Sequence, residues 1–164
     1  ETREMTCPFT GDQLVLLAAL NPDVAIIHVQ RADSYGNAQI DGLPFMDMDI
    51  AKAASKVILT TERLIDNAQI RRAPDRTRIP FFTTDAVVEV PFGCAPHECY
   101  GTYEPFFDQM NDYAKLVSAD PDKGAARYLK NHFYDTATWE DYLERFGTAA
   151  MLDASRRGRS IYDD

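Results

Sequence analysis

The segment DVAIIHVQ, residues 23–30, decides the fold class because it is short, rich in β-branched residues and almost continuously apolar. The turn signal Asn21-Pro22 precedes it. A run of this kind is typical of a strand buried on both faces of a parallel sheet. A second such run, KVILTTE at 56–62, follows an Ala-rich stretch at 47–55 that predicts a helix. Strand, helix and strand in alternation predict an α/β layer.

Further short strands are predicted at 38–40, 79–82 and 86–90. Pro80 cannot donate a backbone hydrogen bond, so the segment 79–82 is expected at a sheet edge or at a strand start. We predict that the runs beginning at Val24, Val57 and Val87 share one open, mostly parallel sheet.

The hydrophobic pattern changes near residue 100. Beyond it, apolar residues recur every three or four positions within 106–117, 126–133 and 139–146, which predicts three helices. Thr138 is expected to cap the third helix and Gly147 to end it.

These two patterns divide the chain. We expect an α/β sheet domain over residues 1–103 and a helical extension over 104–164. The end of the extension, from Ala154, contains several arginines and is expected to be a frayed tail.

Composition excludes several function classes. The 164 residues are 45% hydrophobic and 26% charged, with a net charge of -9. General nucleic-acid binders have basic surfaces, so the acidic net charge disfavours this class. No apolar run approaches the roughly 20 residues of a membrane span. The three cysteines are too few for a disulfide framework and suit a reducing, cytoplasmic environment. The chain has no initiator Met, which suggests a piece of a longer protein.

No metal site is predicted from spacing. The sequence contains no HExxH, its three histidines lie far apart, and Cys94 and Cys99 lack the CxxC spacing. His28 lies within the first predicted strand, where a hydrogen-bonded core histidine is the favoured interpretation.

The segment QRADSYGN, residues 30–37, follows the carboxyl end of the first predicted strand. Ligands bind at this edge in open α/β sheets. Gly36 and Asn37 adopt positive φ at low cost, and the Asn37 amide can orient a substrate carbonyl. A plain turn with a surface pair between Arg31 and Asp33 is an equally good interpretation.

Two other segments carry candidate chemistry. The loop at 91–101 places His97 beside Glu98 and can wall a pocket, although a structural crossover into the helices is favoured. Four arginines at 71–78 can hold phosphates, although a solvated face or a subunit contact is the commoner outcome.

Several stretches resemble the α subunits of family I CoA-transferases. They are CPFTG at 7–11, LNPDVAIIHVQRADSYGN at 20–37, RRAPDRT at 71–77, VVEVPFG at 87–93 and YLERFG at 142–147. The Tyr-rich helical finish is similar to the glutaconate CoA-transferase α-subunit branch. The resemblance runs from Cys7 to about Gly147 and matches only the C-terminal half of such a subunit.

The resemblance implies the sheet of the CoA-transferase type and a partner β subunit. In that family the nucleophilic glutamate lies in the β subunit, within a Ser-Glu-Asn-Gly-like motif. No such motif occurs here, so Glu62, Glu89 and Glu98 are not assigned as nucleophiles. CoA would move between an acyl-CoA and a carboxylic acid through a glutamyl-CoA thioester on the partner.

In this interpretation the chain supplies pocket walls and interface, is inactive alone, and belongs to an oligomer. Coenzyme A is a substrate and no bound cofactor is expected. The expected substrate-binding residues are Gln30, Arg31, Gly36, Asn37 and His97. Neither nucleic acid nor a membrane is expected as a partner.

Two alternatives remain open. The chain could belong to a CoA-ester hydrolase of the same fold. It could also be a non-catalytic module that binds a phosphate ligand through the arginines at 71–78.

Overall fold

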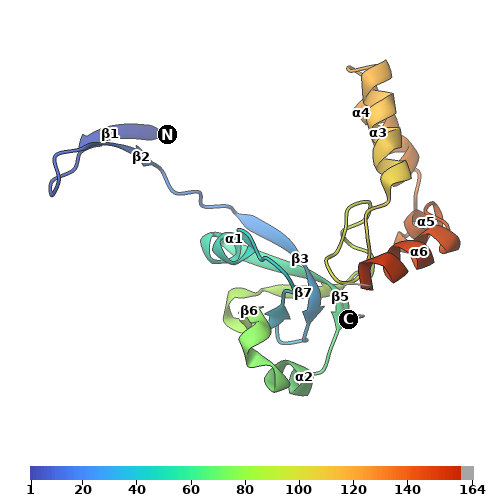
Figure 1. Cartoon of the computed structure of the whole chain (residues 1–164), viewed down its shortest axis with the longest axis horizontal. Helices are drawn as coiled ribbons and strands as arrows, with labels where there is room; N and C mark the ends of the chain where they lie inside the picture. The colour runs from blue at the N-terminus through green and yellow to red at the C-terminus, as the bar shows by residue number, and fades with distance from the viewer. Residues whose placement is uncertain (160–164) are drawn as a thin grey trace.

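A five-stranded sheet lies at the centre of the computed structural model, which describes residues 1–159 (Figure 1). Its strands, in spatial order, are β6 (Thr77–Ile79), β4 (Ala38–Gln39), β3 (Val24–Ala32), β5 (Lys56–Leu64) and β7 (Ala86–Glu89). β3, β5 and β7 are mutually parallel, whereas β4 and β6 pair antiparallel. The prediction of one open, mostly parallel sheet is therefore confirmed.

One face of this sheet holds the core. Ile27 and Val29 of β3 and Leu59 of β5 are buried there, and Ala51 of α1 (Asp47–Ala53) packs against them. Burying this face stabilises the fold by roughly 1.5–3 kcal/mol for each large aliphatic side chain.

The opposite face differs from the expectation of a strand buried on both sides. Ile26, Ile58 and Ala86 are aligned in register across β3, β5 and β7. Val24 is 50% exposed, Ile26 71% and Val88 48%. The run at 23–30 is apolar on both faces, but within residues 1–159 this end of the second face has little cover.

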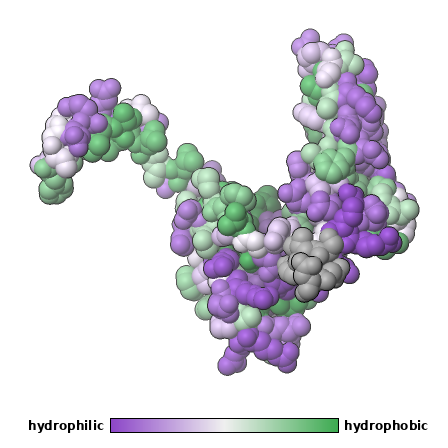
Figure 2. Space-filling view, viewed as in Figure 1, coloured by the Kyte–Doolittle hydropathy of each residue, from purple (hydrophilic) through white to green (hydrophobic). Residues whose placement is uncertain are grey.

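A separate antiparallel hairpin precedes the sheet and extends away from it in Figure 1. It consists of β1 (Thr2–Thr6) and β2 (Gln13–Leu17), and Gly11 takes a φ of 81° in the connecting loop. Figure 2 shows hydrophobic residues gathered along this hairpin and the segment that joins it to β3. Leu14, Leu17 and Leu20 are among those exposed there. No strand had been predicted in this segment.

Between β5 and β7 the chain forms short helical turns. Asp66 caps α2 (Asn67–Arg72) through a capping box, and η1 (Pro74–Arg76) leads into β6. The predicted strand at 79–82 is wrong beyond Ile79, because η2 (Phe81–Thr83) follows. Pro80 has no N–H for a strand ladder, and its carbonyl instead accepts from Thr83 N at 3.0 Å.

The second half is helical, as predicted. The helices are α3 (Phe107–Ala119), α4 (Gly124–Leu129), a π-helical turn η3 (Lys130–Tyr134), α5 (Trp139–Glu144) and α6 (Thr148–Arg159). Thr138 caps α5 through a capping box with Asp141. Within residues 1–159, none of the helices combines the length and the apolar content that crossing a bilayer requires.

The expected frayed tail from Ala154 is helical as far as Arg159, because α6 docks on the body of the protein. Ala154 is buried, and Gly158 packs directly against the backbone of Tyr103. The rest of that expected tail, residues 160–164, lies outside the described residues.

A second core joins the sheet to the helices. Tyr103 and Phe106 are buried in it, and Phe92 stacks on Tyr103 with ring centroids 4.8 Å apart. The α5 side chains bind the loop after β7: Trp139 Nε1 donates to Pro91 O at 3.0 Å, and Tyr142 OH donates to Ala95 O at 3.2 Å. The loop at 91–103 is therefore held on both sides.

Candidate functional site

A cationic cavity lies at the carboxyl ends of the central parallel strands. Arg31 of β3 and Arg63 of β5 are paired in register, each one residue before its strand ends. They line a cavity of about 520 Å³. The lining consists of Arg31, Asp41, Glu62, Arg63, Arg76, Pro91, Phe92, Gly101, Thr102, Ser155 and Arg159. This is the sheet edge at which α/β proteins bind ligands.

The charge of this cavity favours an anion. Four guanidinium groups line it, against the carboxylates of Asp41 and Glu62. Arg31 Nη2 lies 2.6 Å from Asp41 Oδ1, and its Nε donates to Gln39 Oε1 at 3.2 Å. These contacts fix the Arg31 side chain. Guanidinium groups match the geometry of carboxylates and phosphates, so the cavity can hold either group.

Glu62 borders the cavity but is fully engaged. Its carboxylate accepts from His28 Nε2 at 2.8 Å and from Tyr103 OH at 2.7 Å. The backbone N–H groups of Phe92 and Gly93 also donate to it, at 2.8 and 3.1 Å. A carboxylate saturated with donors is a holding group, which supports leaving Glu62 unassigned as a nucleophile.

The Tyr103 hydroxyl is buried beside the Glu62 carboxylate, which changes its pKa. Burial and the neighbouring Glu62 carboxylate raise the pKa of the Tyr103 phenol, so this hydroxyl stays protonated and donates.

Two thiols lie beside the same network, on the loop after β7. A hydrogen bond from Cys99 is the main cause that lowers the pKa of Cys94 to about 7. The pKa of Cys99 is raised, first by its bond to Cys94 and then by burial. One potential ligand atom from each of His28, Cys94 and Cys99 lies within 4.8 Å of the others. Spacing along the chain had given no sign of this cluster.

Gln30 and Arg31 both form hydrogen bonds with Asp41. Gln30 is buried, its Oε1 accepts from Asp41 N at 3.1 Å, and its Nε2 donates to Tyr100 O at 3.2 Å. Gln30 thus fixes Asp41, which in turn holds Arg31.

Gly36 and Asn37 lie in the turn after β3 and outside the lining of the cavity. Gly36 has a φ of 100°, and an added Cβ would lie 2.7 Å from Thr84 Cβ. The Asn37 amide donates to Asp33 Oδ2 at 2.9 Å and accepts from Phe81 N at 3.1 Å. In this structure the amide therefore holds the turn together.

His97 and most of the arginines at 71–78 lie outside the cationic cavity. His97 is exposed on the loop and outside the cavity lining. Arg71 and Arg72 of α2 border a different, shallow hollow, whereas Arg76 reaches the cationic cavity. Sequence reasoning missed Arg63 and Arg159. Arg63 directly follows the strand predicted at 56–62, so the rule that singled out Arg31 would have found it.

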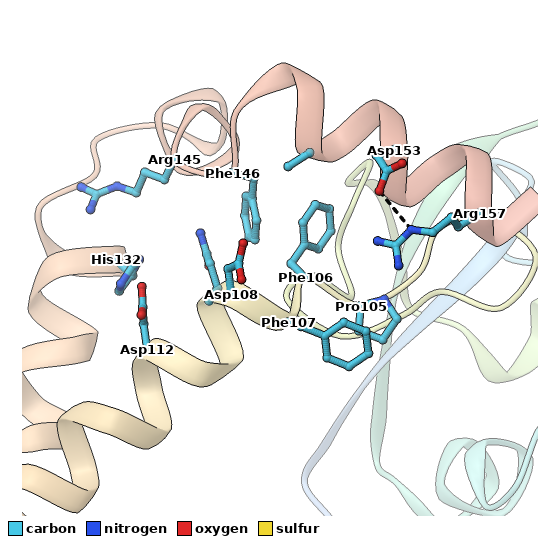
Figure 3. A pocket seen from close by; sticks show the side chains of 12 residues that line it. Pro105, Phe106, Phe107, Asp108, Asp112, His132, Arg145, Phe146, Asp153 and Arg157 are labelled. Carbon is cyan, nitrogen blue, oxygen red and sulfur yellow. Dashed lines mark ion pairs between the residues drawn. The ribbon is translucent and has the colours of Figure 1, made fainter.

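A second cavity, of about 510 Å³, lies among the C-terminal helices (Figure 3). His132 and Asp112 face Arg145 on one side of it, and Asp153 pairs with Arg157 at 3.1 Å on the other. Its mixed charges, and a lining that contains no residue of the central sheet, make it the weaker candidate for a substrate site.

Comparison with known proteins identifies the family to which this fold belongs. Residues 1–90 match the coenzyme A transferase family model, more than half of the chain, and the chain belongs to that family. It is an α-like segment of the family I type.

Particular relatives agree. The chain is 35% identical to one subunit of the glutaconate CoA-transferase of Acidaminococcus fermentans, over 87% of this chain and 44% of that protein. It is 35% identical to one subunit of the 3-oxoadipate CoA-transferase of Pseudomonas knackmussii, over 61% of this chain and 35% of that protein. The crystal structure of the Acidaminococcus fermentans glutaconate enzyme superposes with a TM-score of 0.87 at 32% identity, covering 93% of this chain and 48% of that one. The chain thus spans less than half the length of these relatives.

Proposed function

We propose that this chain is part of the α-like subunit of a two-subunit CoA-transferase, which moves CoA between an acyl-CoA and a carboxylic acid. The observation that carries the proposal is the cationic cavity at the carboxyl edge of the parallel sheet. Both substrates of such an enzyme are anions, one a carboxylate and the other a phosphate-bearing thioester. The family membership supports the general kind of reaction.

The chemistry divides between the two proteins of the pair. A glutamate of the β partner attacks the acyl-CoA carbonyl, which forms a mixed anhydride and releases the CoA thiolate. The thiolate attacks the glutamyl carbonyl, forms a glutamyl-CoA thioester and frees the first acid. The acceptor carboxylate then attacks that thioester, and the displaced thiolate captures the new acyl group, which restores the glutamate. Each covalent step replaces one difficult exchange by an easier one.

In this proposal the chain contributes pocket walls and positive charge to the reaction. Arg31 and Arg63 are proposed to pair with a substrate carboxylate or phosphate, and Arg76 and Arg159, which line the same cavity, add positive charge. Gln30, Gly36, Asn37 and His97 remain proposed substrate-site residues. Gln30 acts through Asp41, and the Gly36–Asn37 turn shapes the sheet edge. His97, exposed on its loop, would require the β partner to complete its site.

The partner interface is proposed on the poorly covered sheet face and the N-terminal hairpin. Parallel sheets are normally covered on both faces. Exposed Ile26, Val88 and Leu17 mark surfaces that suit other parts of the enzyme or the oligomer.

Replacement of Arg63 in the assembled α–β enzyme tests the proposal. We expect Arg63→Met to raise the KM for the acid or for the acyl-CoA about tenfold or more, because a charge-assisted hydrogen bond contributes about 1.5–3 kcal/mol. Exchange of labelled acid into acyl-CoA measures it. Arg127→Met, at an exposed position on α4, is the matched control and should leave KM unchanged.

Three outcomes contradict the proposal. Turnover by the 164-residue chain alone would place the nucleophile here. Thioester loss without an acceptor acid would favour the hydrolase. Equal effects of Arg63→Met and Arg127→Met on KM would mean that the cavity does not bind substrate.

A further inference from the structure

We propose that His28, Cys94 and Cys99 form a zinc site that ties the loop after β7 to the central sheet. The three residues come from β3 and from the loop at 91–103, and their potential ligand atoms lie within 4.8 Å of one another. One imidazole and two thiolates are a donor set that Zn²⁺ binds in proteins.

The dimensions suit a tetrahedral ion. With Zn–S near about 2.3 Å and Zn–N near about 2.0 Å, neighbouring ligand atoms of such a site lie roughly 3.5–4 Å apart. The observed cluster therefore needs only a small contraction around the ion. Two of the three ligands are cysteines, whose side-chain rotation can supply it while the loop backbone stays held.

The hydrogen bonds of His28 prepare one ring nitrogen for the ion. Nε2 lies 2.8 Å from Glu62 Oε1, and the saturated carboxylate can only accept, so Nε2 carries the proton. Nδ1 then presents its lone pair, which accepts from Thr60 Oγ1 at 2.8 Å. An ion at Nδ1 needs the Thr60 oxygen itself to move away, which rotation of the Thr60 side chain about χ1 achieves.

Glu62 thus takes a second role. A carboxylate that accepts from the distal N–H of a metal-binding histidine fixes the ring and increases its basicity. Glu62 is itself held by the Phe92 and Gly93 N–H groups and by Tyr103. It is a positioning residue, not a ligand, in this proposal.

Gly93 explains how the loop reaches the imidazole. A Cβ at this position would overlap His28 Cε1 and lie 2.6 Å from Nδ1. Only glycine lets the backbone next to Cys94 approach the ring edge that carries Nδ1. Gly93 directly precedes Cys94, so this close approach also brings the first cysteine of the cluster near the imidazole.

The site adjoins the cationic cavity. Phe92 and Glu62 line that cavity, and both contact the proposed zinc cluster through Gly93 and His28. Three protein ligands leave a fourth position for water or another small ligand. A bound ion would fix the cavity wall formed by the loop.

Cobalt substitution of the full chain, under a phosphine reductant, tests the proposal. We expect Co²⁺ to give thiolate-to-cobalt charge-transfer bands and the visible bands of a tetrahedral ion, and Zn²⁺ to displace it at one ion per chain. After removal of the phosphine, Zn²⁺ should also protect two thiols from a disulfide reagent while Cys7 stays reactive. Cys7→Ser is the matched control and should retain all signals, because Cys7 lies on the distant hairpin loop.

Variants locate the site independently of any enzymatic activity. Cys94→Ser, at a partly exposed position, should abolish the charge transfer while circular dichroism stays that of the parent chain. Glu62→Gln should weaken zinc binding about 10- to 100-fold. Absence of charge transfer in the parent chain, protection of no thiols, or loss of the signal in Cys7→Ser would each overturn the proposal.

Discussion

Asp33 is the residue on which the turn after β3 depends. It is fully buried, and its carboxylate accepts from Asn67 Nδ2 at 2.7 Å, from Asn37 Nδ2 at 2.9 Å and from two backbone N–H groups of the turn. Burial opposes ionisation, but these hydrogen bonds outweigh it and hold the pKa of Asp33 below its usual value.

Asp33→Asn should destabilise the protein by about 1–3 kcal/mol at neutral pH, because the substituted amide repels the donors. A depressed folded-state pKa adds stability above the unfolded pKa of about 3.9, and that stability is lost as pH falls through the folded value. The difference between parent and variant should therefore shrink below about pH 4. Urea unfolding at both pH values measures it. A pH-independent difference, or an equal loss in exposed Asp75→Asn, would contradict the explanation.

At the scale of residues, the sequence predicted what is local. The carboxyl-edge rule singled out Arg31, and His28 is hydrogen-bonded as expected. The sequence could not predict that Arg76 and Arg159 line the same cavity as Arg31. Nor could it predict that His28 lies close to Cys94 and Cys99. Both contacts depend on how α6 and the loop at 91–103 pack against the sheet, and no local sequence pattern predicts that packing.

At the scale of elements, strands and helices with strong periodicity were predictable and weak ones were not. β3, β5 and β7 are continuous apolar runs, and α3 and α5 carry regular apolar spacing. The hairpin β1–β2 was not predicted, although β2 is a short apolar run, and every residue of its two strands is exposed. The arginines after Ala154 suggested a frayed tail, but Ala154 and Gly158 give the end of α6 a small-residue face that packs on Tyr103.

Gly158→Ala tests the docking of α6. In an isolated helix this change stabilises by about 1 kcal/mol. Here the new Cβ would lie 2.5 Å from Tyr103 N, a backbone atom that cannot rotate away. We expect a net loss of about 1–3 kcal/mol from overpacking and a lower Tm. Exposed Arg156→Ala on the same helix should leave Tm nearly unchanged. A higher Tm in Gly158→Ala would mean that α6 is not docked.

At the scale of the whole molecule, apolar surface is distributed in a way that predicts association. The exposed sheet residues Val24, Ile26 and Val88 lie on one face, and the hairpin adds further exposed leucines (Figure 2). Patches of this kind mark interaction surfaces. The net charge of -9 limits precipitation but does not cover apolar area. The division into residues 1–103 and 104–164 stays a prediction, as does membership of an oligomer.

Sedimentation velocity at increasing concentration should therefore show self-association of this chain in the absence of other subunits. Ile26→Thr keeps a β-branched side chain in β3 but removes part of the apolar contact, for which we expect a loss of about 1–2 kcal/mol. The association constant should then fall about tenfold. Leu152→Thr, equally an exposed aliphatic position but on α6, should leave association unchanged. A monomer at every concentration, or equal effects of both substitutions, would mean that the exposed sheet face is not a docking surface, because burial of Ile26 would then contribute nothing to assembly.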